Sequence, residues 1–207
     1  MMTIIYKFGE AVSPQGQPAM KVSRSQATRN RERIIETAAQ RFRERGFDGI
    51  GIADLMKDVG LTHGGFYGNF SSKDDLIAEA SSRALAQTLA RWSAVAESAP
   101  TELLSSIADI YLSIEHRDDP GTGCLLAAVG PDLSRQAPIV RRVTTDAVRS
   151  ALDFLAERLP GPSRAARRQK AISAYATMLG TMIMSRAVDD PQLSQEILDA
   201  GRASVKP

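Results

Sequence analysis

The chain has 207 residues, of which 43% are hydrophobic and 24% charged, and its formal net charge at pH 7 is +2. These proportions are typical of a globular protein with an ordinary core, and they exclude a chain whose bulk charge attracts nucleic acid, so any such attraction must come from local clustering. The single cysteine, Cys124, excludes an intrachain disulfide, and with only two histidines it leaves no Cys/His cluster that would bind a metal.

Residues 1–22 have no helical period and contain Gly, Pro and Gln, which predicts a disordered or loosely attached tail, with Met20 as a second possible start of translation. The first residues, MMTIIYKFG, lack the cleavage pattern of a signal peptide. The longest apolar stretch, Ala174 to Met184, is too short to span a bilayer. We therefore expect a cytoplasmic protein with no membrane partner.

The next segments have helical periodicity. Apolar residues between Ser23 and Gly46 recur at spacings of three and four, which predicts an amphipathic helix ending at Gly46. Residues 52–59 then form two helical turns that end at Gly60. Residues 63–70, HGGFYGNF, predict a short third helix with Thr62 as its N-cap and two phenylalanines on its buried side.

The remaining segments are also helical, and the class is all-α. Ser72 caps a long helix, with acidic residues in its first turn. Further helices are expected over residues 101–116, 124–130, 138–159 and 164–188, with a loop over residues 117–123. A last helix starts at Asp190 and Pro191 and ends near Gly201. No strand hairpin or internal repeat is visible in the sequence.

Two short helices joined by a glycine turn match the helix-turn-helix arrangement, whose second helix enters the major groove of DNA. Between Lys21 and Phe47 there are eight basic residues and three acidic ones, a local excess of five positive charges beside the predicted recognition helix. A DNA-binding module needs such a cluster, although some of these arginines will pair with neighbouring glutamates.

The run from Arg33 to Leu76 resembles the N-terminal domain of the TetR family of bacterial transcriptional regulators. The family pattern is A-x-x-x-F, then G-F/Y, then G-x-x-x-G-x-x-Y-x-x-F-x-x-K-x-x-L. The matching positions here are Ala38, Phe42, Gly46, Phe47, Gly60, Gly64, Tyr67, Phe70, Lys73 and Leu76. The resemblance covers about a quarter of the chain and implies a DNA-binding domain over residues 23–80.

This resemblance also implies which residues touch a double-stranded DNA operator. In such an interface Tyr67 and Lys73 contact phosphates, whereas His63 and Asn69 read bases. The implied contact set is Gly51, Thr62, His63, Gly64, Gly65, Tyr67, Asn69 and Lys73. This chain departs from many relatives at Ile50 and Gly51, where a hydroxyl is missing, and at Asn69, where histidine is common.

By the same resemblance, residues 81–207 form a helical domain that binds a small-molecule effector and pairs two subunits through the last two long helices. The penultimate helix has more apolar residues than one core-facing stripe requires, which favours a homodimer. Candidate pocket residues are Trp92, Tyr111, Cys124, Phe154, Tyr175, Met178 and Met182, with ordinary core packing as the alternative for each. The effector itself is not identified by the sequence.

Cys124 has two interpretations. A lone thiol in a short apolar helix is usually a small core residue, but the helix N-terminus also favours a reactive thiol. The segment Gly123–Leu125 resembles the G-C-L segment of family members that respond to electrophiles or oxidants. A thiol-based repressor is therefore the alternative to a repressor released by a ligand.

Other function classes have less support. His63 and His116 fall on different elements, and no catalytic triad, carboxylate pair or nucleotide-binding glycine loop is present, so we expect no enzyme, cofactor or metal. A ligand-binding protein of the same fold that lacks operator recognition remains open because of the missing hydroxyls. A membrane-surface protein is disfavoured by the absence of a basic, aromatic-rich helix.

Overall fold

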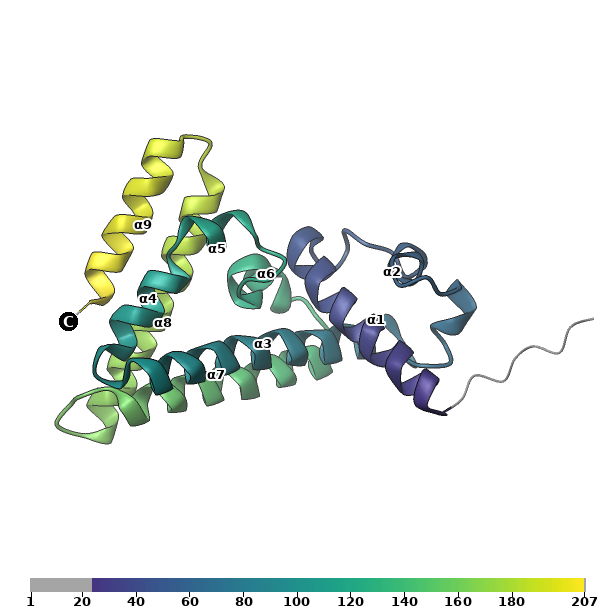
Figure 1. The fold of residues 1–207 in the computed structure, drawn as a ribbon, viewed down its shortest axis with the longest axis horizontal. Coiled ribbons are helices and arrows are strands. Elements are labelled where there is room, and N and C mark those ends of the chain that lie inside the picture. The colour runs from purple at the N-terminus through teal and green to yellow at the C-terminus, as the bar shows by residue number, and fades with distance from the viewer. Residues whose placement is uncertain (1–23, 207) are drawn as a thin grey trace, which may run out of the picture.

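The computed structural model describes residues 24–206, so the predictions for the tail of residues 1–22 and for Met20 lie outside the described residues. Within residues 24–206 every regular element is a helix, which confirms the all-α fold (Figure 1). The α-helices are α1 (Arg24–Arg45), α2 (Ile52–Asp58), α3 (Lys73–Ser98), α4 (Leu103–Tyr111), α5 (Ile114–Asp118), α6 (Leu125–Leu133), α7 (Pro138–Arg158), α8 (Arg164–Ala187) and α9 (Pro191–Val205). Two short 3-10 helices, η1 (His63–Gly65) and η2 (Pro100–Glu102), complete the order.

Several helix ends lie where the sequence predicts them. Gly46 and Gly60 have positive φ angles of 76° and 69°, the left-handed conformation that ends a helix at low cost for glycine. The Ser72 hydroxyl accepts a hydrogen bond of 3.1 Å from the backbone N–H of Asp75 and caps α3. Asp190 caps α9 in the same way. These are local signals that need no tertiary partner.

The prediction of a third α-helix over residues 63–70 is wrong. Residues 63–65 form a single 3-10 turn, and residues 66–69 continue as hydrogen-bonded turns instead of an α-helix. Three glycines in this stretch, Gly64, Gly65 and Gly68, lower its helix propensity by about 1 kcal/mol each. Thr62 stands at the N-cap position, but its side chain accepts no capping hydrogen bond.

Two other boundaries also differ from the prediction. The helix expected over residues 101–116 is two helices, α4 and α5, because Ser113 accepts a hydrogen bond of 3.2 Å from the N–H of His116 and starts a new helix. The last helix continues past Gly201 to Val205. Gly201 is buried beside Thr181, so it permits close packing of α8 and α9 and does not end the helix.

The helices pack around two hydrophobic clusters joined by α3. One cluster combines α1, α2, the start of α3, α6 and the start of α7, and the other combines the end of α3 with α4, α7, α8 and α9. Figure 1 shows α3 and α7 lying side by side, with α1 and α2 at one end and α8 and α9 at the other. The expected domain boundary at residue 80 falls inside α3 and stays a prediction.

Replacing Gly201 by alanine is expected to destabilise the protein by about 1–3 kcal/mol, because the added methyl group overpacks the α8–α9 contact. A Cβ at this position would lie 2.4 Å from both Cγ2 and Oγ1 of Thr181. Denaturant unfolding measures the difference. Gly130→Ala is the matched control, because a Cβ there meets no atom within 4 Å; equal stability of the two variants would contradict the packing argument.

Candidate DNA interface and effector pocket

The helix-turn-helix region is held by a small aromatic core. Phe66 and Phe70 are buried, as predicted, and their rings stack with centroids 5.5 Å apart. Arg33 on α1 donates a hydrogen bond of 2.7 Å to the backbone oxygen of Val59 and so fixes the end of α2. These contacts hold the 63–70 segment on α1 although it is not a regular helix.

The opposite side of this segment faces solvent. Tyr67 is 63% exposed, and its ring meets the edge of His63 at a centroid distance of 5.8 Å. Gly64 is exposed as well, and a Cβ there would touch nothing within 4 Å. Because no contact within the described chain requires glycine at this position, the missing side chain leaves backbone that an external partner can approach.

The other predicted contact residues lie around this exposed surface. Lys73 begins α3, and its Nζ lies 4.0 Å from the carboxylate of Asp48. Gly51 precedes α2 without a side chain to cap it, as expected from the missing hydroxyl. Asn69 is half-buried, and its amide donates a hydrogen bond of 2.8 Å to the Gly65 carbonyl, so it also stabilises its own turn.

Much of the local positive charge is paired with groups of the protein itself. Arg41 pairs with Asp58 at 2.8 Å and with Glu44 at 2.7 Å. Arg31 pairs with Glu79, and its guanidinium lies over the ring of Phe70. Arg24, Arg29 and Arg45 are exposed and form no ion pair within residues 24–206, whereas Lys21 lies outside that range. Only a minority of the basic residues is therefore free for phosphate contact.

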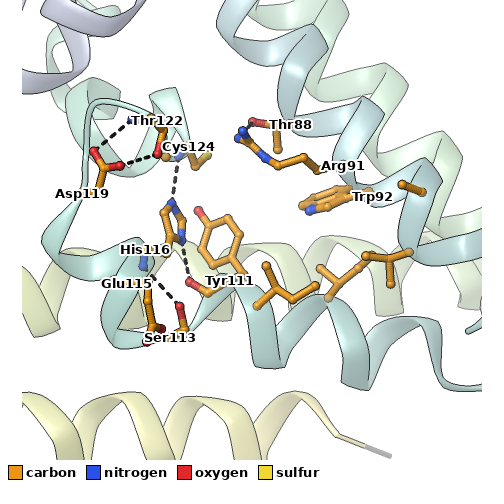
Figure 2. Close-up of a pocket in the computed structure, with 15 residues that line it drawn as sticks. Thr88, Arg91, Trp92, Tyr111, Ser113, Glu115, His116, Asp119, Thr122 and Cys124 are labelled. Atoms are coloured by element: carbon orange, nitrogen blue, oxygen red, sulfur yellow. Dashed lines mark hydrogen bonds between the residues drawn. The ribbon is translucent and has the colours of Figure 1, made fainter. Parts of the chain in front are cut away.

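A pocket of about 430 Å³ opens between α3, α4, α5 and the loop before α6. Trp92, Tyr111 and Cys124 line it, as the sequence predicts (Figure 2). The other four predicted pocket residues are buried in the core but do not line the pocket: Phe154, Tyr175, Met178 and Met182. Tyr175 packs against a pocket residue, because its ring meets that of Trp92 at a centroid distance of 5.0 Å.

Sequence reasoning missed His116 as a pocket residue. Its Nδ1 lies 2.6 Å from the Tyr111 carbonyl oxygen, and its Nε2 accepts a hydrogen bond of 2.9 Å from the N–H of Cys124 (Figure 2). A neutral imidazole that donates through Nδ1 satisfies both contacts. The signal that could have revealed it is Ser113, an N-cap three residues earlier that brings α5 over the pocket.

Protein stability is expected to fall as the pH drops below about 6.5, the value for an unperturbed histidine. Burial lowers the pKa of His116, so the unfolded chain binds a proton before the folded chain does. This contribution is present above the unfolded pKa and is lost as the pH falls toward the folded pKa. Urea unfolding of wild type and His116→Gln at several pH values checks it; an equal loss in both proteins would contradict it.

The loop beside the pocket also contacts the helix-turn-helix region. Arg43 on α1 is buried and donates a hydrogen bond of 3.1 Å to the carbonyl of Gly123. The next residue, Cys124, donates its N–H to His116 on the pocket wall. The Cys124 thiol is only 1% exposed, with Sγ 3.8 Å from the Tyr175 hydroxyl. Two hydrogen bonds therefore connect the pocket wall to α1.

Comparison with known proteins matches the same region. The model of the family described as "Bacterial regulatory proteins, tetR family" matches residues 34–80. An HTH-type transcriptional regulator of Mycobacterium tuberculosis is 30% identical over 171 residues, which span 77% of this chain and 86% of the relative. The HTH-type transcriptional repressor DhaR of Mycobacterium sp. strain GP1 is 25% identical over 111 residues, 54% of this chain and 56% of DhaR.

Solved structures share the whole fold. The reduced form of E. coli NemR superposes with a TM-score of 0.71 at 23% identity, covering 86% of this chain and 95% of NemR. A TetR-family regulator from Agrobacterium tumefaciens has a TM-score of 0.72 at 20% identity, covering 87% of this chain and all of that one.

Within residues 24–206 no helix is long and apolar enough to cross a bilayer.

Proposed function

Because the chain belongs to the TetR family of bacterial regulatory proteins, we propose that it is a dimeric repressor, which a small-molecule effector releases from a palindromic operator. The chain is a helix-turn-helix transcriptional regulator, and this membership confirms that it is not an enzyme. The proposal includes a cytoplasmic location, a DNA-binding domain over residues 23–80 and an effector-binding and dimerisation domain over residues 81–207.

The observation that carries the operator proposal is the exposed surface of the 63–70 segment on a buried aromatic core. The segment is anchored by Phe66 and Phe70, yet it presents Tyr67 and the bare backbone of Gly64 to solvent. Backbone N–H groups, a phenol and a nearby lysine are phosphate-binding groups. The contact set proposed from the sequence is retained, with Asn69 also stabilising its own turn.

The dimer proposal is supported by a second apolar face on the last two helices. We define the α8–α9 face by its exposed or half-buried residues at helical spacing: Ile172, Ala176, Leu179, Ile183, Leu193, Ile197 and Ala200. The opposite side of α8, including Met178 and Met182, is fully buried in the core of the same subunit. Exposed apolar stripes on two adjacent helices favour an isologous contact with a second copy.

The effector proposal depends on the contact between the pocket and α1. A ligand that moves His116 or the Gly123–Cys124 backbone changes the acceptor of the buried Arg43 guanidinium. Release then requires only that the ligand prefers the conformation with lower operator affinity, and about 2.7 kcal/mol of preference changes that affinity about 100-fold.

Arg43→Met is expected to uncouple the pocket from the operator while leaving operator affinity nearly unchanged. Allosteric coupling is reciprocal, so operator binding in wild type should alter amide hydrogen exchange in residues 119–125, by an amount equivalent to about 1–3 kcal/mol. In the variant this change should disappear. Arg41→Met, which removes a half-buried arginine of the same helix that pairs with Asp58 and does not contact the pocket loop, is the control. An unaltered exchange response in Arg43→Met would contradict the coupling.

A thiol-based repressor is the second candidate, because Cys124 lies on the pocket wall beside the same hydrogen bonds. Modification of a buried thiol there would displace its neighbours and act on Arg43 as a ligand does. Cys124→Ser distinguishes the two modes. If electrophiles release the operator from this variant as they do from wild type, and if a thiol reagent labels wild type no more than this cysteine-free variant, the thiol mode is rejected.

A gel shift with the DNA upstream of the chain's own gene tests the operator proposal. We expect a salt-sensitive, sequence-dependent complex that excess non-specific DNA does not displace. If no such complex forms on that DNA or with a random-sequence selection library, the operator proposal is wrong. The chain would then be a ligand-binding protein without operator recognition, the alternative suggested by the missing hydroxyls at Ile50 and Gly51.

A further inference from the structure

The pocket has an apolar part and a polar part. Trp92 and Val95 from α3 and Ile107 and Ile110 from α4 form the apolar part. Thr88 and Arg91 from α3 and the phenol of Tyr111 form the polar part, next to Cys124. Figure 2 shows the ends of Arg91 and Tyr111 directed from different helices toward the same side of the pocket.

The hydroxyl of Tyr111 has no hydrogen-bond partner among the described residues. The side chain is only 5% exposed, and the oxygen is fully covered. Burial raises the pKa of this phenol well above its ordinary value, so it is a neutral donor. A buried donor without an acceptor is unfavourable, and a ligand with an acceptor atom at this point would relieve it.

The surroundings of this hydroxyl contain three guanidinium groups that lack a direct ion pair. Arg43 donates to the Gly123 carbonyl and the Gln87 amide, and Arg186 donates to the carbonyls of two α5 residues. Arg91 donates only to the Thr88 hydroxyl, at 3.4 Å. None of the three guanidiniums forms an ion pair with a carboxylate within residues 24–206, and Arg43 Nε and Arg186 Nη1 are buried without a partner. Such charges favour an anion nearby.

Two carboxylates also line the pocket, but both are engaged at its α5 end. Asp119 accepts hydrogen bonds from the Thr122 backbone N–H at 3.3 Å and from the Thr122 hydroxyl at 2.6 Å. Glu115 lies in the first turn of α5, where its own backbone N–H and the Ser113 hydroxyl lower its carboxyl pKa. An anionic group is therefore repelled from this end and favoured beside Arg91 and Tyr111.

We propose that the pocket binds a small carboxylic acid with an apolar body, as its carboxylate. The carboxylate pairs with the guanidinium of Arg91 and accepts a hydrogen bond from the Tyr111 hydroxyl, whereas the apolar body packs on Trp92 and Ile107. A carboxylate fits because its two oxygens match the arginine fork and leave a lone pair for the phenol. The site deepens the proposed function, since this acid would be the effector.

Fluorescence titration of the full chain tests the site, because Trp92 is the only tryptophan and lines the pocket. The probes are aryl and alkyl carboxylic acids of about four to ten carbons, each with its uncharged primary amide. We expect at least one acid to bind about tenfold or more tightly than its amide. Arg91→Gln should weaken that acid about tenfold to 100-fold and leave the amide unchanged. Tyr111→Phe should weaken the acid by a similar factor and the amide less, because the amide carbonyl accepts only a neutral hydrogen bond from the phenol.

Tyr175→Phe and Arg149→Gln are the matched controls, because they remove a buried hydroxyl and an arginine that do not line the pocket. Thermal melting confirms that each variant is folded. Equal affinity for acid and amide, no saturation by any acid, or unchanged acid binding by both pocket variants would overturn the site. The titration contains no DNA, so its result does not depend on whether the protein binds an operator. If an acid binds the pocket but does not release the operator, the site is supported and the acid is not the effector.

Discussion

Replacing Tyr67 and Lys73 together by alanine is expected to weaken operator binding about 100-fold or more without unfolding the protein. Both side chains are proposed to contact phosphates, and a hydrogen bond to a charged group contributes about 1.5–3 kcal/mol. Two such losses amount to at least about 3 kcal/mol, or about two orders of magnitude in affinity. Tyr67 is 63% exposed, so its removal costs the core little.

Gel shifts at several salt concentrations measure this effect. Loss of Lys73 from both subunits of the dimer should also reduce the slope of log affinity against log salt concentration by about two, because two fewer counterions are released. Lys170→Ala, on α8, is the control that removes the same charge away from the proposed interface. If the double variant keeps both the affinity and the salt slope of wild type, the proposed phosphate contacts are wrong.

Ile183→Asp should separate the dimer and, through it, lower operator affinity by at least about 100-fold. Ile183 is 39% exposed in the single subunit and lies in the middle of the α8–α9 face. A carboxylate buried there in a dimer would have no partner, which strongly disfavours association. A single subunit binds only one half-site of the operator. It therefore loses the gain in affinity that comes from holding a second DNA-binding domain at high effective concentration beside the other half-site.

Analytical ultracentrifugation gives the oligomeric state, and a gel shift on the same samples gives operator affinity. Ile183→Val keeps the face apolar and should remain dimeric with wild-type affinity. The subunit fold should survive in both variants, because the core side of α8 is unchanged. A dimeric Ile183→Asp protein would place the subunit contact elsewhere.

Helix ends could be predicted well because their causes lie within a few residues. Gly46 and Gly60 adopt positive φ angles, and Ser72 and Asp190 bond the first free N–H groups of their helices. Gly201 shows the limit of this reasoning. The same residue type is a frequent helix end, but here the approach of Thr181 from α8 explains the glycine.

The pocket could be predicted only in part, because helical spacing shows which residues share a face and not what covers that face. Trp92 and Tyr111 line the pocket, whereas Tyr175 and Met178 on α8 are buried in the hydrophobic core and do not line it. His116 lines the pocket because Ser113 starts a separate helix, α5, and the position of α5 depends on its tertiary contacts.

The amino-acid sequence by itself determined the all-α class and the two short segments around Gly60, since periodicity, capping and glycine content act over a few residues. The exposure of Gly64 and Tyr67 was implied by the family resemblance. Only the tertiary structure decided that residues 63–65 form a 3-10 turn, and that Arg43 of α1 reaches the pocket loop at Gly123. Residues 43 and 123 are distant in the chain, so their contact depends on how α1, α3 and α6 pack together.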